Sequence, residues 1–172
     1  MLRLSLLILI FLACMGAGVY LGSVYSFRLD DLRRFKKGLL MLRSEIDYLS
    51  TPLNQALHNI AHKLGRAHPM AQFFEGIAQR LDAQSAPERA VADSLSNYQS
   101  RLYLSSEDRE AVCAFGKTLG YLDKTLQLEA IAMTLAYVDE RIQQEREHSL
   151  KYKKMYQTLG VLAGLLVVVL FI

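Results

Sequence analysis

The sequence has no tryptophan, only three prolines and only two cysteines among its 172 residues. Cys14 and Cys113 fall in different parts of the chain, so we do not expect a disulfide, and a free Cys113 fits a reducing compartment. No alternation of period two persists anywhere, which argues against β-strands. The formal net charge of +3 is too small to indicate a nucleic-acid-binding protein.

Sequence motifs of catalysis are missing as well. The chain contains no G-x-S-x-G frame and no glycine-rich phosphate loop. His58 and His62 are four residues apart and share a helix face, which is a metal-binding spacing, but Asn59 stands where a zinc protease carries glutamate. We therefore predict a protein that is not an enzyme and that needs no cofactor. A small membrane metalloenzyme using His58 and His62 is the least favoured alternative.

Uncharged, mostly apolar runs occupy both ends of the chain, from Leu4 to Phe27 and from Met155 to Ile172. A membrane helix needs about 20 such residues. The first run meets this length, and we interpret it as a retained span rather than a cleaved signal peptide. The second is marginal and either spans the bilayer or dips into it. The predicted domains are a membrane helix (1–27), a helical bundle (28–154) and a second membrane segment (155–172).

Basic residues cluster on the inner side of each run. They are Arg28, Arg33, Arg34, Lys36 and Lys37 after the first run and Lys151, Lys153 and Lys154 before the second. The positive-inside rule then predicts a cell-membrane protein with its central domain in the cytoplasm. The same residues could contact anionic membrane lipid, although fixing the topology is sufficient to explain them.

Each apolar run also contains a pair of glycines at the G-x-x-x-G spacing. Gly18 and Gly22 form the first pair, and Gly160 and Gly164 form the second. Small residues at this spacing allow membrane helices to approach closely. The pairs predict packing within the membrane and make a homo-oligomer possible.

The middle of the chain shows nearly continuous helical periodicity. Apolar residues stepping by three and four form a seam for helix packing, namely Leu32, Phe35, Leu39, Leu42, Ile46 and Leu49. Pro52, Pro69 and Pro87 mark the starts of three further helices. Ser105 caps a fifth, and a sixth begins near Asp123. We predict an all-α fold, a six-helix antiparallel up-down bundle whose first and last helices continue into the membrane spans, with a solvated, highly charged stalk over residues 139–154.

Two stretches resemble one family. Residues 43–57 (RSEIDYLSTPLNQAL) and 115–124 (FGKTLGYLDK), followed by the closing LGVLAGLL of residues 159–166, are similar to the stage III sporulation protein AB family of endospore-forming bacteria. That family is similar in turn to the F-type platform domain of type II secretion machines. Gly120, Leu122 and Leu126 match the G-x-L-x-x-x-L element that opens the last helix there. Platform proteins usually carry two such domains, whereas this chain has one.

The resemblance implies a role rather than a reaction. The family belongs to a secretion-like channel complex between mother cell and forespore, and its bundle is thought to engage a secretion-type ATPase on the mother-cell side. We therefore expect a non-enzymatic, membrane-anchored coupling component whose partners are that ATPase and other channel proteins. The alternative is an oligomerising membrane tether that has no ATPase partner.

Overall fold

The structure, a computed structural model, describes residues 16, 27–49, 51–120 and 123–171; most side chains beyond Arg146 are not described. These residues form six helices and no strand when 27–49 is counted as one helix, so the all-α prediction is confirmed for them. The chain divides into two compact units. One is Asp30–Ile142, and the other combines Met1–Leu29 with Gln143–Ile172.

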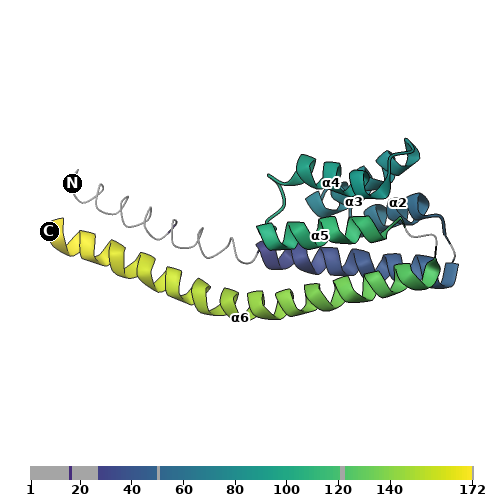
Figure 1. The fold of residues 1–172 in the computed structure, drawn as a ribbon. Helices are drawn as coiled ribbons and strands as arrows, with labels where there is room; N and C mark the ends of the chain where they lie inside the picture. The colour runs from purple at the N-terminus through teal and green to yellow at the C-terminus, as the bar shows by residue number, and fades with distance from the viewer. Residues whose placement is uncertain (1–15, 17–26, 50, 121–122, 172) are drawn as a thin grey trace. The chain divides into compact units, whose positions relative to one another are not determined.

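An α-helix over residues 27–44 runs directly into a π-helical turn, η1 (Glu45–Leu49). The later helices are α2 (Leu53–Leu64), α3 (Pro69–Asp82), α4 (Pro87–Tyr98), α5 (Ser106–Thr118) and α6 (Lys124–Phe171). Within the bundle, α2 packs on α3, α3 on α4 and α4 on α5. Figure 1 shows α5 and the first half of α6 running alongside the helix of residues 27–44.

The helices begin where the sequence predicts. Pro69 and Pro87 occupy the first turns of α3 and α4, where a missing N–H is tolerated. Ser105 caps α5 in a reciprocal capping box with Asp108. Gly65 ends α2 with a positive φ of 91°, a conformation that glycine adopts without steric cost.

The core of the bundle contains the predicted seam with one exception. Leu32, Phe35, Leu39, Leu42 and Ile46 are buried, but Leu49 is 65% exposed. The prediction for Leu49 was wrong because it assumed an uninterrupted α-helix. A π turn takes more residues per turn than an α turn, so it shifts the residues after Ile46 out of the α-helical register.

Phe74 occupies the centre of the bundle beside a glycine. Its ring stacks on Phe35 with centroids 6.0 Å apart and tilts against Phe73 at 5.5 Å. A Cβ added at Gly38 would lie 2.5 Å from the Phe74 ring, so only glycine leaves room for the ring there. Gly116 of α5 makes a similarly close approach to Val91 of α4, at 2.8 Å.

The predicted solvated stalk is only partly solvated. Asp139 pairs with Lys36, and Arg141 pairs with Glu107. In the other unit, the Glu145 carboxylate is nearly buried and accepts a 2.6 Å hydrogen bond from Arg28. Charge density alone suggested exposure, but these groups carry long-range ion pairs and face other helices.

The predicted first membrane span, including Gly18 and Gly22, lies outside the described residues apart from Gly16 and Phe27. The second predicted segment is helical up to Phe171 as the end of α6. Over the part of the chain that the structure describes, no helix is both long enough and apolar enough to cross a membrane.

Candidate protein-binding surface

A buried carboxylate holds the η1 turn in place. Glu45 accepts hydrogen bonds from the Thr51 hydroxyl at 3.0 Å and from the Lys63 ammonium at 3.1 Å. Burial raises the pKa of Glu45, but the hydrogen bonds from Lys63 and Thr51 outweigh that effect and leave the pKa below its ordinary value. The charged form of Glu45 therefore connects the end of the first helix to α2.

The turn places two large apolar side chains on the surface. Tyr48 is 82% exposed and Leu49 is 65% exposed. Beside η1 lies a hollow of about 310 Å³ lined by Ile46, Thr51, Leu53, Lys124 and Gln127. We call Tyr48, Leu49 and this hollow the distal surface, because the chain reaches it about 28 Å along the first helix from Asp30, where the unit begins.

Lys124 ties the start of α6 to this surface. Its ammonium donates a 2.6 Å hydrogen bond to the carbonyl oxygen of Asp47 and lies 3.3 Å from the Asp47 carboxylate. Two residues further on, Leu126 is 48% exposed in the first turn of α6. π turns are often found at functional sites, and exposed aromatic and aliphatic side chains beside a hollow are typical of protein contact surfaces.

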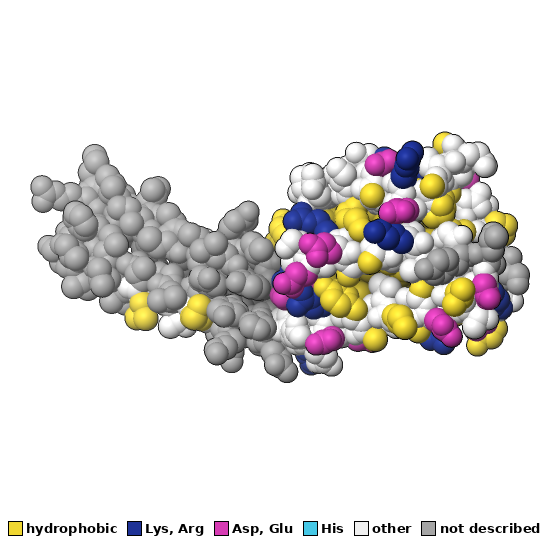
Figure 2. Space-filling view, viewed as in Figure 1, with side chains coloured by type: hydrophobic (Ala, Val, Ile, Leu, Met, Phe, Trp, Pro, Cys, Tyr) yellow, Lys and Arg dark blue, Asp and Glu magenta, His cyan; other side chains and the backbone are white. Residues whose placement is uncertain are grey.

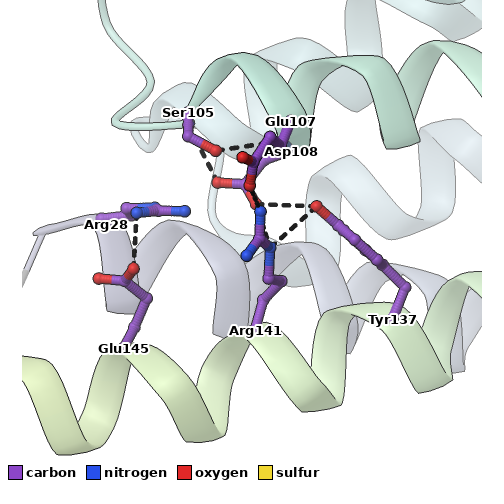
Figure 3. Close-up of polar contacts among 7 residues, drawn as sticks. All are labelled: Arg28, Ser105, Glu107, Asp108, Tyr137, Arg141 and Glu145. Carbon is purple, nitrogen blue, oxygen red and sulfur yellow. Dashed lines mark hydrogen bonds and ion pairs between the residues drawn. The ribbon is translucent and has the colours of Figure 1, made fainter.

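A polar network fixes α5 to α6 (Figure 3). The Asp108 carboxylate accepts a 2.9 Å hydrogen bond from the Ser105 backbone N–H and a 3.4 Å bond from the Tyr137 hydroxyl. Arg141 pairs with both Glu107 and Asp108, and its guanidinium lies 5.4 Å from the centre of the Tyr137 ring. Because the Asp108 carboxylate is almost completely buried, this network stabilises the fold rather than presenting a reactive group.

A third buried acid, Asp31, fixes the loop between α4 and α5. It accepts a 2.7 Å hydrogen bond from the Tyr103 backbone N–H. Burial raises the pKa of Asp31, and this effect exceeds the opposing effects of the Tyr103 hydrogen bond and of nearby His68. His68 caps α3 by accepting from the Met70 N–H, and its other ring nitrogen lies 3.3 Å from Asp30.

His58 bridges two acids across the pair formed by α2 and α3. Its Nδ1 lies 3.0 Å from Glu75 and its Nε2 lies 2.8 Å from Asp82. The hydrogen bond to Asp82, followed by the one to Glu75, raises the pKa of His58, and the same contact lowers the pKa of Asp82. The arrangement is an electrostatic clamp that requires a protonated imidazole.

This clamp predicts a pH-dependent stability. The pKa of His58 in the folded chain lies above its ordinary value of 6.5, so its contribution is complete below pH 6.5 and is lost as the pH rises through the folded pKa. We expect the unfolding midpoint of the wild type to fall over this range more than that of His58→Gln. Denaturant titrations at several pH values would measure the difference. His62→Gln is the matched control, because His62 is exposed and has no acidic partner within the described ranges; an equal pH response in all three proteins would refute the clamp.

The structure does not bring the two histidines of the metal alternative into one site. Both ring nitrogens of His58 face carboxylates, whereas His62 is exposed. Among the residues with a described placement, no three His, Cys, Asp or Glu side chains are grouped to hold a metal ion. The metalloenzyme alternative therefore has no support in this part of the chain.

The basic residues predicted to flank the membrane have different surroundings. Arg28, Arg34 and Lys36 form ion pairs with Glu145, Asp30 and Asp139, respectively. Arg33 and Lys37 are exposed, and neither forms an ion pair within the described part of the chain. Lys151, Lys153 and Lys154 lie on α6, where their side chains are not described.

Gly120 and Leu126 of the predicted last-helix motif lie on either side of the start of α6. Gly120 is exposed just beyond α5, and an added Cβ would be 3.6 Å from Pro87. Leu122 lies outside the described residues. Gly160 and Gly164 belong to the helical backbone of α6.

Sequence reasoning missed Tyr48 as a surface residue and Glu45 and Asp108 as buried acids. Glu45 falls on the buried side of the seam next to Ile46, and that position was a signal for a paired carboxylate. Asp108, three residues after Ser105, completes a capping-box pattern that was visible in the sequence. The π turn that moves Leu49 out of the seam had no comparable signal.

Fold and surfaces together define an all-helical domain whose described features are packing seams, ion-pair networks and an apolar contact surface. The family model of stage III sporulation protein AB matches residues 3–172. A protein of that name from Bacillus subtilis (strain 168) is 31% identical over 171 residues, which are 99% of each chain. A solved structure of stage III sporulation protein AB covers 72% of this chain and 97% of its own, with 27% identity and a TM-score of 0.66. The chain belongs to the stage III sporulation protein AB family.

Proposed function

We propose that this protein is a non-enzymatic, membrane-anchored component of the secretion-like channel complex between mother cell and forespore, and that its bundle engages a secretion-type ATPase. Membership of the sporulation family supports the process. The long uncharged ends support anchoring in the mother-cell membrane, and the basic residues beside them support a cytoplasmic bundle.

The distal surface is the observation that carries the ATPase proposal. Tyr48 and Leu49 expose large apolar area at the end of the bundle opposite Asp30 and Ile142, where the chain enters and leaves this unit. A partner in the cytoplasm could reach this end without interference from a membrane at the other. Exposed aromatic residues beside a hollow are the usual anchors of a protein interface.

The test is recruitment of the ATPase by variants of the distal surface. Tyr48→Asp and Leu49→Asp should each lower co-purification of the ATPase with the full chain from sporulating cells by about tenfold or more, because each buries a charge in the proposed interface. Ala92→Asp adds the same charge at an exposed position of α4 and should leave recruitment unchanged.

Unfolding midpoints would separate loss of binding from loss of folding, since both residues are exposed. Full recruitment by both distal variants would refute this surface as the ATPase site. A wild-type chain that co-purifies with no ATPase and no channel protein would refute the coupling function and favour a plain membrane tether.

A further inference from the structure

A second apolar surface lies along α5 and α6 and begins about one turn of α6 beyond the hollow of the distal surface. A groove of about 260 Å³ separates the two helices, with Ala111, Ala114, Ala130 and Thr134 along its walls and Phe115 among the residues that line it. Met133 stands at its edge and is 75% exposed. Small side chains on both walls leave space for side chains from another helix.

Acidic residues accompany this groove. Glu110 precedes Ala114 by one turn on α5, and Glu129 precedes Met133 by one turn on α6; both are exposed. Within the described ranges neither forms an ion pair, whereas Glu107 nearby is neutralised by Arg141. Figure 2 shows exposed hydrophobic side chains on this side of the bundle, with both acidic and basic ones next to them. The groove therefore favours a partner helix that carries basic and apolar residues on one face.

The same chain carries such a face. On the helix of residues 27–44, Arg33, Lys37 and Leu40 repeat at intervals of four and three residues on the exposed side, and Arg43 follows. Leu40 is 47% exposed. None of these three basic residues forms an ion pair within the described part of the chain. The basic stripe, Arg33 to Arg43, is about 15 Å long, which fits within the length of about 20 Å expected for the 13 residues of α5.

A chain cannot place this stripe in its own groove. Phe35, on the core side of the same helix, contacts Phe115 edge-to-face with ring centroids 6.4 Å apart. The stripe lies on the opposite side of that helix from Phe35, so the stripe and the groove face away from each other. Only another molecule can bring the two surfaces together.

We propose that the bundle self-associates head to tail, with the basic stripe of one copy bound in the acidic α5/α6 groove of the next. Leu40 enters the groove beside Met133, and the basic residues of the stripe pair with Glu110 and Glu129. The two contacting surfaces differ, so the contact is heterologous. Repeated from copy to copy, such a contact either closes a ring or grows into a filament. The residues named for this contact include none of those that form the distal surface.

Charge reversal on each surface tests the proposal. The stripe variant carries Arg33→Glu and Lys37→Glu, and the groove variant carries Glu110→Lys and Glu129→Lys. Sedimentation of the full chain in detergent should show self-association of the wild type. Each variant alone should self-associate at least about tenfold more weakly, because like charges then face each other. An equal mixture of the two variants should recover association, since the reversed stripe matches the reversed groove.

The other outcomes overturn the proposal. A monomeric wild type, variants that associate as the wild type does, or a mixture that stays apart would each exclude the head-to-tail contact. Loss of ATPase recruitment in the groove variant without a change in self-association would assign the groove to the ATPase instead. Weaker binding of the stripe variant to vesicles rich in phosphatidylglycerol, again with unchanged self-association, would assign the stripe to lipid. Unchanged unfolding midpoints would confirm that the exposed substitutions leave the fold intact.

Discussion

Replacing Asp108 by alanine is expected to lower the free energy of unfolding by about 3–5 kcal/mol, as for other buried ion pairs that lose one partner. The substitution removes the acceptor of the Ser105 N–H, which opens the capping box of α5. It also removes one of the two α5 carboxylates that hold Arg141 of α6, together with the acceptor of the Tyr137 hydroxyl, and leaves only Glu107 paired with Arg141. Denaturant unfolding of the full chain would measure the change.

Two variants make this prediction specific. Asp108→Asn keeps an acceptor oxygen for the Ser105 N–H but loses the charge, so its cost should fall between those of the wild type and the alanine variant. Asp93→Ala removes an exposed aspartate on α4 and should change the stability by less than about 0.5 kcal/mol. A loss for Asp108→Ala no greater than for Asp93→Ala would show that the network contributes nothing.

Replacing Phe74 by alanine should destabilise the bundle by a similar amount, about 3–5 kcal/mol. The ring is 1% exposed and packs against Phe35 and Phe73, so its removal leaves a cavity in the centre of the core. Gly38→Ala alone should also destabilise the bundle. Overpacking against the Phe74 ring costs about 1–3 kcal/mol, and the higher helix propensity of alanine offsets about 1 kcal/mol of that cost.

The two substitutions should compensate when combined. In the Phe74→Ala background the methyl group of Gly38→Ala no longer meets a ring at 2.5 Å, so it can fill part of the cavity. We expect the double variant to lose clearly less stability than the sum of the single losses, a coupling of about 1–3 kcal/mol between contacting sites. Strict additivity across this double-mutant cycle would contradict the described contact.

The sequence allowed the helix boundaries to be predicted because local chemistry determines them. Pro69, Pro87 and the Ser105 cap act within one turn of themselves, so no knowledge of distant residues is needed. The seam from Leu32 to Ile46 follows for the same reason, since a regular α-helix fixes which residues share a face.

The candidate surface could not be predicted from such local rules. Leu49 belongs to the apolar seam by spacing, but the π turn held by Glu45 and Lys63 changes its direction. The same holds for one contact in the core. Phe74 and Gly38 are far apart in sequence, and neither residue alone indicates that the Phe74 ring fills the space left by the missing Cβ of Gly38. Long-range partners likewise decide which charges between Asp139 and Glu145 are buried.

The order of helix contacts has a consequence for how the chain folds. Helices α2, α3 and α4 each pack on the next helix in sequence, which gives that part of the bundle a low contact order and favours rapid folding. The helix of residues 27–44 is different, because Phe35 reaches Phe115 of α5 and Lys36 reaches Asp139 of α6. During synthesis this helix can meet Phe74 of α3 early, but its contacts with α5 and α6 wait for residues made on the order of ten seconds later. A nascent chain stalled before α5 would lack the Phe115 contact, so we expect that ribosome-bound chain to leave part of the Phe35 side uncovered and to be prone to aggregate.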